Sequence, residues 1–146
     1  VSPRTPVPGY GAPIRELAEQ ALERFELTAY RDKVTRVLPG GVRKVLDIAM
    51  AMAVQPKILL LDEPTSGVSA EEKFGIMDMV MGVVREAGTT VLFVEHDMEV
   101  VARHADRVLA FYDGRIIADG KPDEALNHEQ VLKHIVGHTQ HATTGQ

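Results

Sequence analysis

Acidic and imidazole side chains follow two apolar stretches of the sequence. Asp62 and Glu63 come directly after the apolar run 58–61, and His96 comes two residues after the run 91–94. Such runs are typical of buried parallel strands, and ligands of parallel sheets bind beyond the carboxyl ends of the strands. One carboxylate could hold a hydrated Mg²⁺ while the other activates a water, and a histidine could stabilise a phosphate. Taken singly, each group could also be an ordinary polar residue at a strand end or before a helix.

The segment between the two runs predicts how these groups are positioned. Strands are predicted over 57–62 and 89–95, with a helix between them. Ser69 and Glu72 have the spacing of a capping box at the start of that helix, and Gly88 is placed to end it. A strand, helix and strand in this order form a right-handed βαβ unit with parallel strands, which are usually neighbours. Both strands would then end at the same edge of the sheet.

Two glycines form a second candidate site. Gly40 and Gly41 follow Pro39 and precede an apolar helix predicted over 42–54. Glycines at a helix N-terminus let backbone N–H groups approach an anion closely. Two glycines after a proline are also common in plain turns, so this pattern alone leaves both interpretations open.

The remaining elements are predicted from periodicity and turn signals. They are an amphipathic helix over 13–27, a short helix from Met98 to His104 after a cap at Asp97, a hairpin over 107–118 that turns at Asp113-Gly114, and helices over 122–126 and 130–136.

Composition excludes several function classes. The 146 residues are enough for one domain or a piece of a larger one, and 45% of them are hydrophobic. The 16 Lys and Arg against 21 Asp and Glu give a net charge of −5 without long blocks of either sign, so a nucleic-acid partner is not expected. The absence of cysteine excludes disulfides and thiol nucleophiles. Because no run approaches about 20 apolar residues, no direct membrane insertion is expected.

Several motifs, taken in this order, resemble the nucleotide-binding subunit of an ABC transporter. They are Leu38-Pro39-Gly40-Gly41, Ile58 to Thr65, Ser66 to Ser69, and Val94 to Asp97. The resemblance implies an α/β fold: a partial P-loop ATPase (RecA-like) parallel sheet with flanking helices, a C-terminal β-hairpin and an N-terminal piece of the helical subdomain. It divides the chain into a helical part with the signature loop (1–56), a part of the ATPase core (57–120), and C-terminal helices with a polar tail (121–146).

The same resemblance implies roles for the polar residues toward ATP and Mg. Asp62, which ends the Walker B strand, would hold Mg²⁺ through water, Glu63 would be the general base, and His96 would be the switch histidine that faces the γ-phosphate. The nucleotide-contacting residues would be those of the signature loop and of the D-loop at the dimer interface. They are Leu38, Pro39, Gly40, Gly41, Ser66, Gly67 and Ser69.

Partners also follow from the resemblance. In the family the signature loop caps ATP held by a second ATP-binding subunit, in a homo- or heterodimer, and transmembrane permease subunits choose the solute. The subunit would be cytoplasmic and peripheral on the inner face of the cell membrane. Glu95-His96-Asp97-Met98 and the ending 131–137 are similar to importers of branched-chain or other hydrophobic amino acids, and urea-type importers look alike.

The sequence also departs from the family pattern. No Gly-x-x-x-x-Gly-Lys-[Ser/Thr] occurs, and this Walker A loop cradles the phosphates. Pro39, Val42 and Ser69 replace a serine, a glutamine and an acidic or amide residue that are usual at those positions. We therefore expect this chain to be the C-terminal portion of an ATPase subunit that is inactive alone. Its unpaired strand edges should make the isolated chain associate, rearrange or aggregate. The alternative is a non-catalytic dimerisation or interaction module derived from such a subunit.

Overall fold

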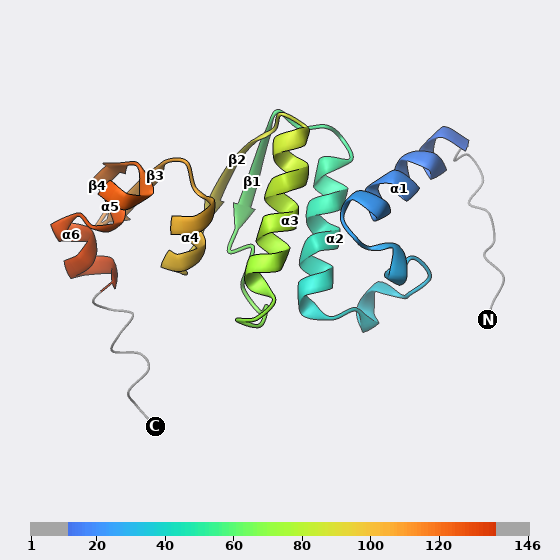
Figure 1. Ribbon diagram of the computed structural model, residues 1–146, viewed down its shortest axis with the longest axis horizontal. Coiled ribbons are helices and arrows are strands. Elements are labelled where there is room, and N and C mark those ends of the chain that lie inside the picture. Colours follow the sequence, from blue (N-terminus) through green and yellow to red (C-terminus); the bar gives the residue numbers. More distant parts are fainter. Residues whose placement is uncertain (1–11, 137–146) are drawn as a thin grey trace, which may run out of the picture. The chain divides into compact units, whose positions relative to one another are not determined.

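A computed structural model describes residues 12–136 of the chain (Figure 1). The chain divides into two compact units, one that ends at Val94 and one that begins at Glu95. Each unit is described by itself below. No helix within residues 12–136 is long and apolar enough to cross a membrane.

Over residues 12–94 the first unit contains three α-helices, two short 3₁₀ turns and two strands. They are α1 (Ala12–Arg24), η1 (Thr28–Tyr30), η2 (Thr35–Val37), α2 (Gly40–Met52), β1 (Ile58–Asp62), α3 (Lys73–Glu86) and β2 (Thr90–Val94). The predicted strands and helices are therefore present, with ends that shift by a few residues.

The two strands are parallel neighbours, as the βαβ pattern predicts. Their register runs from Ile58 opposite Thr90 to Asp62 opposite Val94. The buried face of this sheet packs on helices, and Leu59 there is only 5% exposed. On the opposite face Leu60 is 69% exposed. The expectation of strands covered on both faces is thus wrong for the described residues, because α2 and α3 supply a cover on one side only.

Helices α2 and α3 lie side by side and provide most of the core (Figure 1). Ile48 from α2 and Val80 and Val84 from α3 are 6%, 0% and 1% exposed. Burying each such side chain contributes about 1.5–3 kcal/mol. This packing fixes α2 and α3 relative to β1, and so positions the residues that follow β1.

Both ends of α3 are defined by hydrogen bonds. At its C-terminus Gly88 has φ +66°, and the N–H of Thr89 donates to the carbonyl of Val84 at 3.1 Å, as in a Schellman motif. At its N-terminus the prediction is corrected. Ser69 and Glu72 do bond to each other, but in the turn before the helix, and α3 begins only at Lys73. Their side chains satisfy that turn instead of the first helical N–H groups.

The second unit contains a hairpin and short helices. They are α4 (Met98–His104), β3 (Val108–Tyr112), β4 (Arg115–Gly120), α5 (Pro122–Leu126), α6 (Glu129–Val131) and a π-helical turn, η3 (Leu132–Val136). The carboxylate of Asp97 accepts hydrogen bonds from the N–H groups of Glu99 and Val100, which confirms the predicted cap of α4.

The hairpin forms where the Asp113-Gly114 pair predicts it. Both residues have positive φ, +48° and +72°, which matches the twist of a tight antiparallel turn. At the end of the hairpin away from the turn, the Arg107 guanidinium donates two hydrogen bonds to the Asp119 carboxylate, at 2.8 and 2.7 Å. These hydrogen bonds lower the pKa of the Asp119 carboxyl below its usual range and raise the pKa of Arg107. Within the described chain β3 and β4 pair only with each other.

Candidate functional site

The predicted acidic pair lies at the carboxyl end of β1. Asp62 is the last residue of this strand and is exposed. The N–H of Glu63 donates to the carbonyl of Val94 at 2.9 Å, so Glu63 extends the pairing with β2 by one bond. The end of β2 and the acidic pair are therefore at one edge of the sheet. An exposed carboxylate at this edge is open to a hydrated divalent cation, which commonly takes one or two protein carboxylates plus waters.

The backbone of Glu63 has an unusual conformation. Its φ is +45°, in the left-handed region that costs a residue with a side chain about 1–2 kcal/mol. Two hydrogen bonds hold the carbonyl of this residue. The N–H of Ser66 donates to it at 3.0 Å, and the ammonium of Lys44 donates to it at 3.1 Å. Glu63 is thus fixed through both of its peptide groups, and its half-buried side chain leaves the strand in a set direction.

Lys44 is a residue that sequence analysis missed. It stands in α2, one turn after Gly40, and is partly buried. Nothing in the local pattern marks it, because its partner is 19 positions away in the sequence. The only sequence feature that could have pointed to Lys44 is the position of a basic residue one turn after the glycine pair.

The glycine pair begins α2 and packs on the loop after β1. A Cβ atom on Gly40 would lie 3.2 Å from the carbonyl oxygen of Gly67, and one on Gly41 would lie 2.9 Å from the side chain of Ile76. Gly67 itself has φ +75°. The absence of side chains at Gly40 and Gly41 therefore permits close contact between the predicted signature loop and the predicted D-loop.

The other residues of these two loops differ in burial. Leu38 is 7% exposed and anchors the loop before α2. Pro39 is the N-cap residue of α2 and makes no capping hydrogen bond with its side chain. Ser66 and Ser69 are exposed, and the Ser69 hydroxyl donates to the Glu72 carboxylate at 2.7 Å. The structure thus gathers Asp62, Glu63, both glycines and the 66–69 loop in one unit.

His96 belongs to the second unit. It is exposed, and its N–H donates to the carboxylate of Glu95 at 3.2 Å. Asp97, directly after it, caps α4. The role of His96 toward a phosphate remains a prediction.

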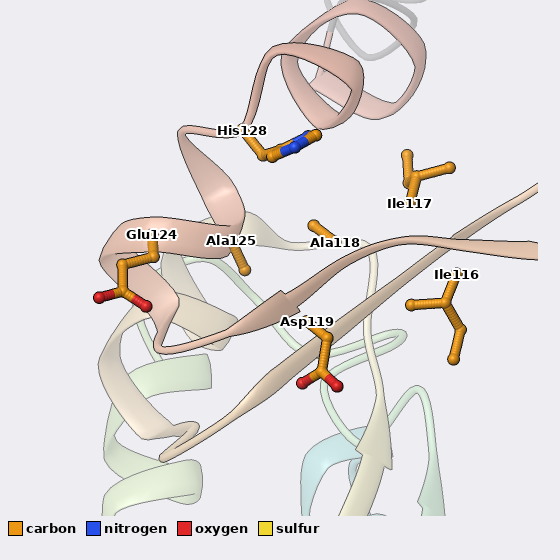
Figure 2. Close-up of a pocket in the computed structure, with 7 residues that line it drawn as sticks. All are labelled: Ile116, Ile117, Ala118, Asp119, Glu124, Ala125 and His128. Carbon is orange, nitrogen blue, oxygen red and sulfur yellow. The ribbon is translucent and has the colours of Figure 1, made fainter.

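The second unit also contains a hollow that was not predicted. Its volume is about 400 Å³, and Figure 2 shows its lining side chains: Ile116, Ile117, Ala118, Asp119, Glu124, Ala125 and His128. The Asp119 carboxylate is already paired with Arg107. Over residues 12–136, moreover, no three His, Asp or Glu side chains are grouped so that they could hold a metal ion.

Known proteins are similar to this chain over most of its length. Residues 10–66 match the family model described as ABC transporter. The chain is 37% identical over 117 residues to the methionine import ATP-binding protein MetN of Caulobacter vibrioides, which is 80% of this chain and 35% of that protein. It is also 37% identical over 121 residues to the cobalt import ATP-binding protein CbiO of Rhodobacter capsulatus, which is 83% of this chain and 43% of that protein.

Solved structures show the same fold. MJ1267, an ATP-binding cassette of an ABC transporter solved in its ADP conformation, matches 91% of this chain and 54% of its own, with 26% identity and a TM-score of 0.80. CbiO1 of Clostridium perfringens, part of the ABC transporter complex CbiONQ, matches 88% of this chain and 54% of its own, with 30% identity and a TM-score of 0.73. The fold is that of the ABC ATPase cassettes. The comparisons support an ABC-transporter ATP-binding domain. This chain spans about half the length, or less, of the proteins that it matches.

Proposed function

We propose that this chain supplies the signature-loop, Walker B and switch-histidine portion of an ABC-transporter ATPase subunit. The complete subunit couples ATP binding and hydrolysis to import of branched-chain or other hydrophobic amino acids. It works as a dimer of ATP-binding subunits with transmembrane permease subunits, on the inner face of the cell membrane. Within this proposal the chain has no ATPase activity by itself.

Each proposed site residue has a distinct task. Glu63 would accept a proton from the water that attacks the terminal phosphate, Asp62 would hold Mg²⁺ through water, and His96 would donate a hydrogen bond to the transferring phosphate. Bound Mg²⁺ would neutralise charge that develops on the phosphate oxygens. The backbone of Gly40 and Gly41 would contact nucleotide held by the opposite subunit.

One observation carries the proposal. The acidic pair, the glycine-initiated helix and the 66–69 loop are joined by direct contacts, from Lys44 to the Glu63 carbonyl and from Gly40 to Gly67. An acidic pair that only solvated a strand end would need none of these contacts.

The choice of solute rests on less specific features. The motif Glu95-His96-Asp97-Met98 is similar to that of hydrophobic amino acid importers. The MetN relative is named for import of methionine, and methionine is also a hydrophobic amino acid. The CbiO relative is named for cobalt import instead. Growth on single amino acids by cells that depend on the complete transporter would decide between these classes.

The proposed chemistry is tested by restoring the phosphate loop. A chimeric subunit joins this chain to a segment of a relative that contains Gly-x-x-x-x-Gly-Lys-[Ser/Thr], and phosphate release from Mg-ATP is measured. We expect hydrolysis, and we expect Glu63→Gln to lower kcat at least about 100-fold, because a positioned base contributes that much. Glu71→Gln, in the exposed turn before α3, is the matched control and should retain wild-type turnover.

Two results would contradict the proposal. Wild-type turnover in the Glu63→Gln chimera would remove the general-base role. Dimerisation of the chimera without any hydrolysis would instead support the alternative of a non-catalytic interaction module.

Titration of Mg-ATP into the chain without the added segment should give no heat of binding.

A further inference from the structure

We infer that Lys44 is a positioning residue that couples the glycine loop at the start of α2 to the carboxylate of Glu63. The inference rests on the proposed function for the role of Glu63. It adds a residue that lies in neither the acidic pair nor the glycine pair. It also assigns a purpose to the hydrogen bond between a helix and the turn after a strand.

The contact acts on the one strained peptide of the site. Lys44 Nζ donates to the carbonyl oxygen of Glu63 at 3.1 Å, and the residue that carries this carbonyl has φ +45°. The same oxygen also accepts the Ser66 N–H at 3.0 Å, which closes the turn into the 66–69 loop. Hydrogen bonds from a charged donor are roughly twice as strong as neutral ones. Lys44 therefore adds a charged donor to a carbonyl that the turn also holds.

The other peptide group of Glu63 is tied to the sheet. Its N–H donates to the carbonyl of Val94 at 2.9 Å. With one side held by β2 and the other by α2, the residue cannot relax to an ordinary backbone conformation without breaking a bond. If the bond to Lys44 is lost, rotation at Glu63 toward negative φ is still opposed by the hydrogen bonds to Val94 and Ser66 but by one restraint fewer, and such a rotation would turn its carboxylate away from the strand end.

The coupling to the glycines follows from the geometry of α2. Gly40 is the first residue of this helix and Lys44 is one turn further, so the two move as parts of one rigid element. Gly40 also lies close to the Gly67 carbonyl, on the loop that begins at the same turn. A phosphate bound at Gly40 and Gly41 would therefore bias the backbone of Glu63 in the same chain. Within the proposed dimer this connects the nucleotide capped by the subunit to the nucleotide that the subunit hydrolyses.

The first test measures amide hydrogen exchange in the 146-residue chain. Lys44→Met keeps the aliphatic stem and removes the donor, and Lys44→Arg retains a donor. Arg43→Met removes the neighbouring exposed charge as a control. We expect the Ser66 amide to exchange about tenfold faster in Lys44→Met, and within twofold of wild type in the other two variants. The amides of Val80 and Val84 in the core should exchange as in wild type.

Two exchange results would overturn the inference. One is an unchanged Ser66 amide in Lys44→Met. The other is equal acceleration at Ser66, Val80 and Val84, because it would show that Lys44 stabilises the whole unit without a specific effect on Glu63. Failure of Lys44→Arg to restore protection would also count against a donor role.

The second test uses the chimeric subunit. Lys44→Met should lower kcat about tenfold with an unchanged KM for ATP, and Lys44→Arg should restore most of the loss. If kcat is unchanged in Lys44→Met while Glu63→Gln is inactive, the coupling is refuted and the proposed function stands. If the wild-type chimera does not hydrolyse ATP, the proposed function fails, while the exchange experiment still reports on the link between Lys44 and Glu63.

Discussion

Replacement of Glu63 by glycine should stabilise the folded chain, although Glu63 is the residue proposed to be essential for hydrolysis. The reason is its φ of +45°, which glycine adopts without steric penalty. Glu63→Gln is the matched comparison, because glutamine has nearly the same shape and keeps the strained backbone. Both variants lose the carboxylate charge, so the difference between them reports the backbone conformation together with the loss of the rest of the half-buried side chain.

The magnitude follows from two opposing terms. Relief of the left-handed conformation contributes about 1–2 kcal/mol. The greater freedom of glycine in the unfolded chain offsets about 0.5–1 kcal/mol of this gain. The midpoints of the two terms leave the glycine variant about 0.75 kcal/mol more stable than the glutamine variant. For a chain of this size that corresponds to a Tm higher by about 1.5–3 °C.

The assay is thermal and urea unfolding followed by circular dichroism. Glu71→Gly, at an exposed position of the turn before α3 where φ is not positive, measures the entropic term alone and should destabilise the chain by about 0.5–1 kcal/mol. If Glu63→Gly is no more stable than Glu63→Gln, the backbone of Glu63 is not strained. In that case the Lys44 bond does not hold a high-energy conformation.

Three further outcomes are expected from other parts of the structure. Asp97→Ala should destabilise the chain by about 1 kcal/mol in urea unfolding, because the cap accepts two N–H groups of α4, whereas an asparagine replacement should be nearly neutral. Arg107→Met should raise the pKa of Asp119 toward its ordinary value in an NMR titration. Since the folded-state pKa of Asp119 is depressed, the stabilisation from this pair is present above the unfolded-state pKa and is lost as pH falls through the folded-state pKa. An unchanged titration in the variant would show that Arg107 is not the cause. Leu60→Lys and Leu92→Lys, on the exposed sheet face, should reduce self-association in light scattering with little loss of stability, and unchanged scattering would exclude this face as the contact.

Elements with a strong local signal could be predicted from the sequence. Asp97 caps α4, Gly88 ends α3, and Asp113-Gly114 turns the hairpin, because in each case the required backbone geometry depends on one or two side chains. The order of strand, helix and strand fixed the parallel neighbours and hence the edge at which Asp62 lies. These parts needed no knowledge of distant contacts.

The other features depend on tertiary packing. The positive φ of Glu63 occurs at a residue type that gives no conformational signal, and the bond that holds it comes from Lys44 in another element. Ser69 and Glu72 have the correct spacing for a cap, yet their side chains are used within a turn. An apolar strand pattern likewise indicates that both faces of the strand favour apolar contacts. The pattern does not indicate whether another element packs on each face, as the exposed Leu60 shows.

The parallel pairing of β1 with β2 also determines when the acidic pair can form during folding. Ile58 pairs with Thr90, and all of α3 lies in the intervening loop. The entropy of closing that long loop must be overcome before the first hydrogen bond between the strands is made. The hairpin of β3 and β4, by contrast, closes over the two residues Asp113 and Gly114. A growing or unfolded chain can therefore contain the hairpin as local structure, but Asp62 and Glu63 reach their places only after the slow, non-local step is complete.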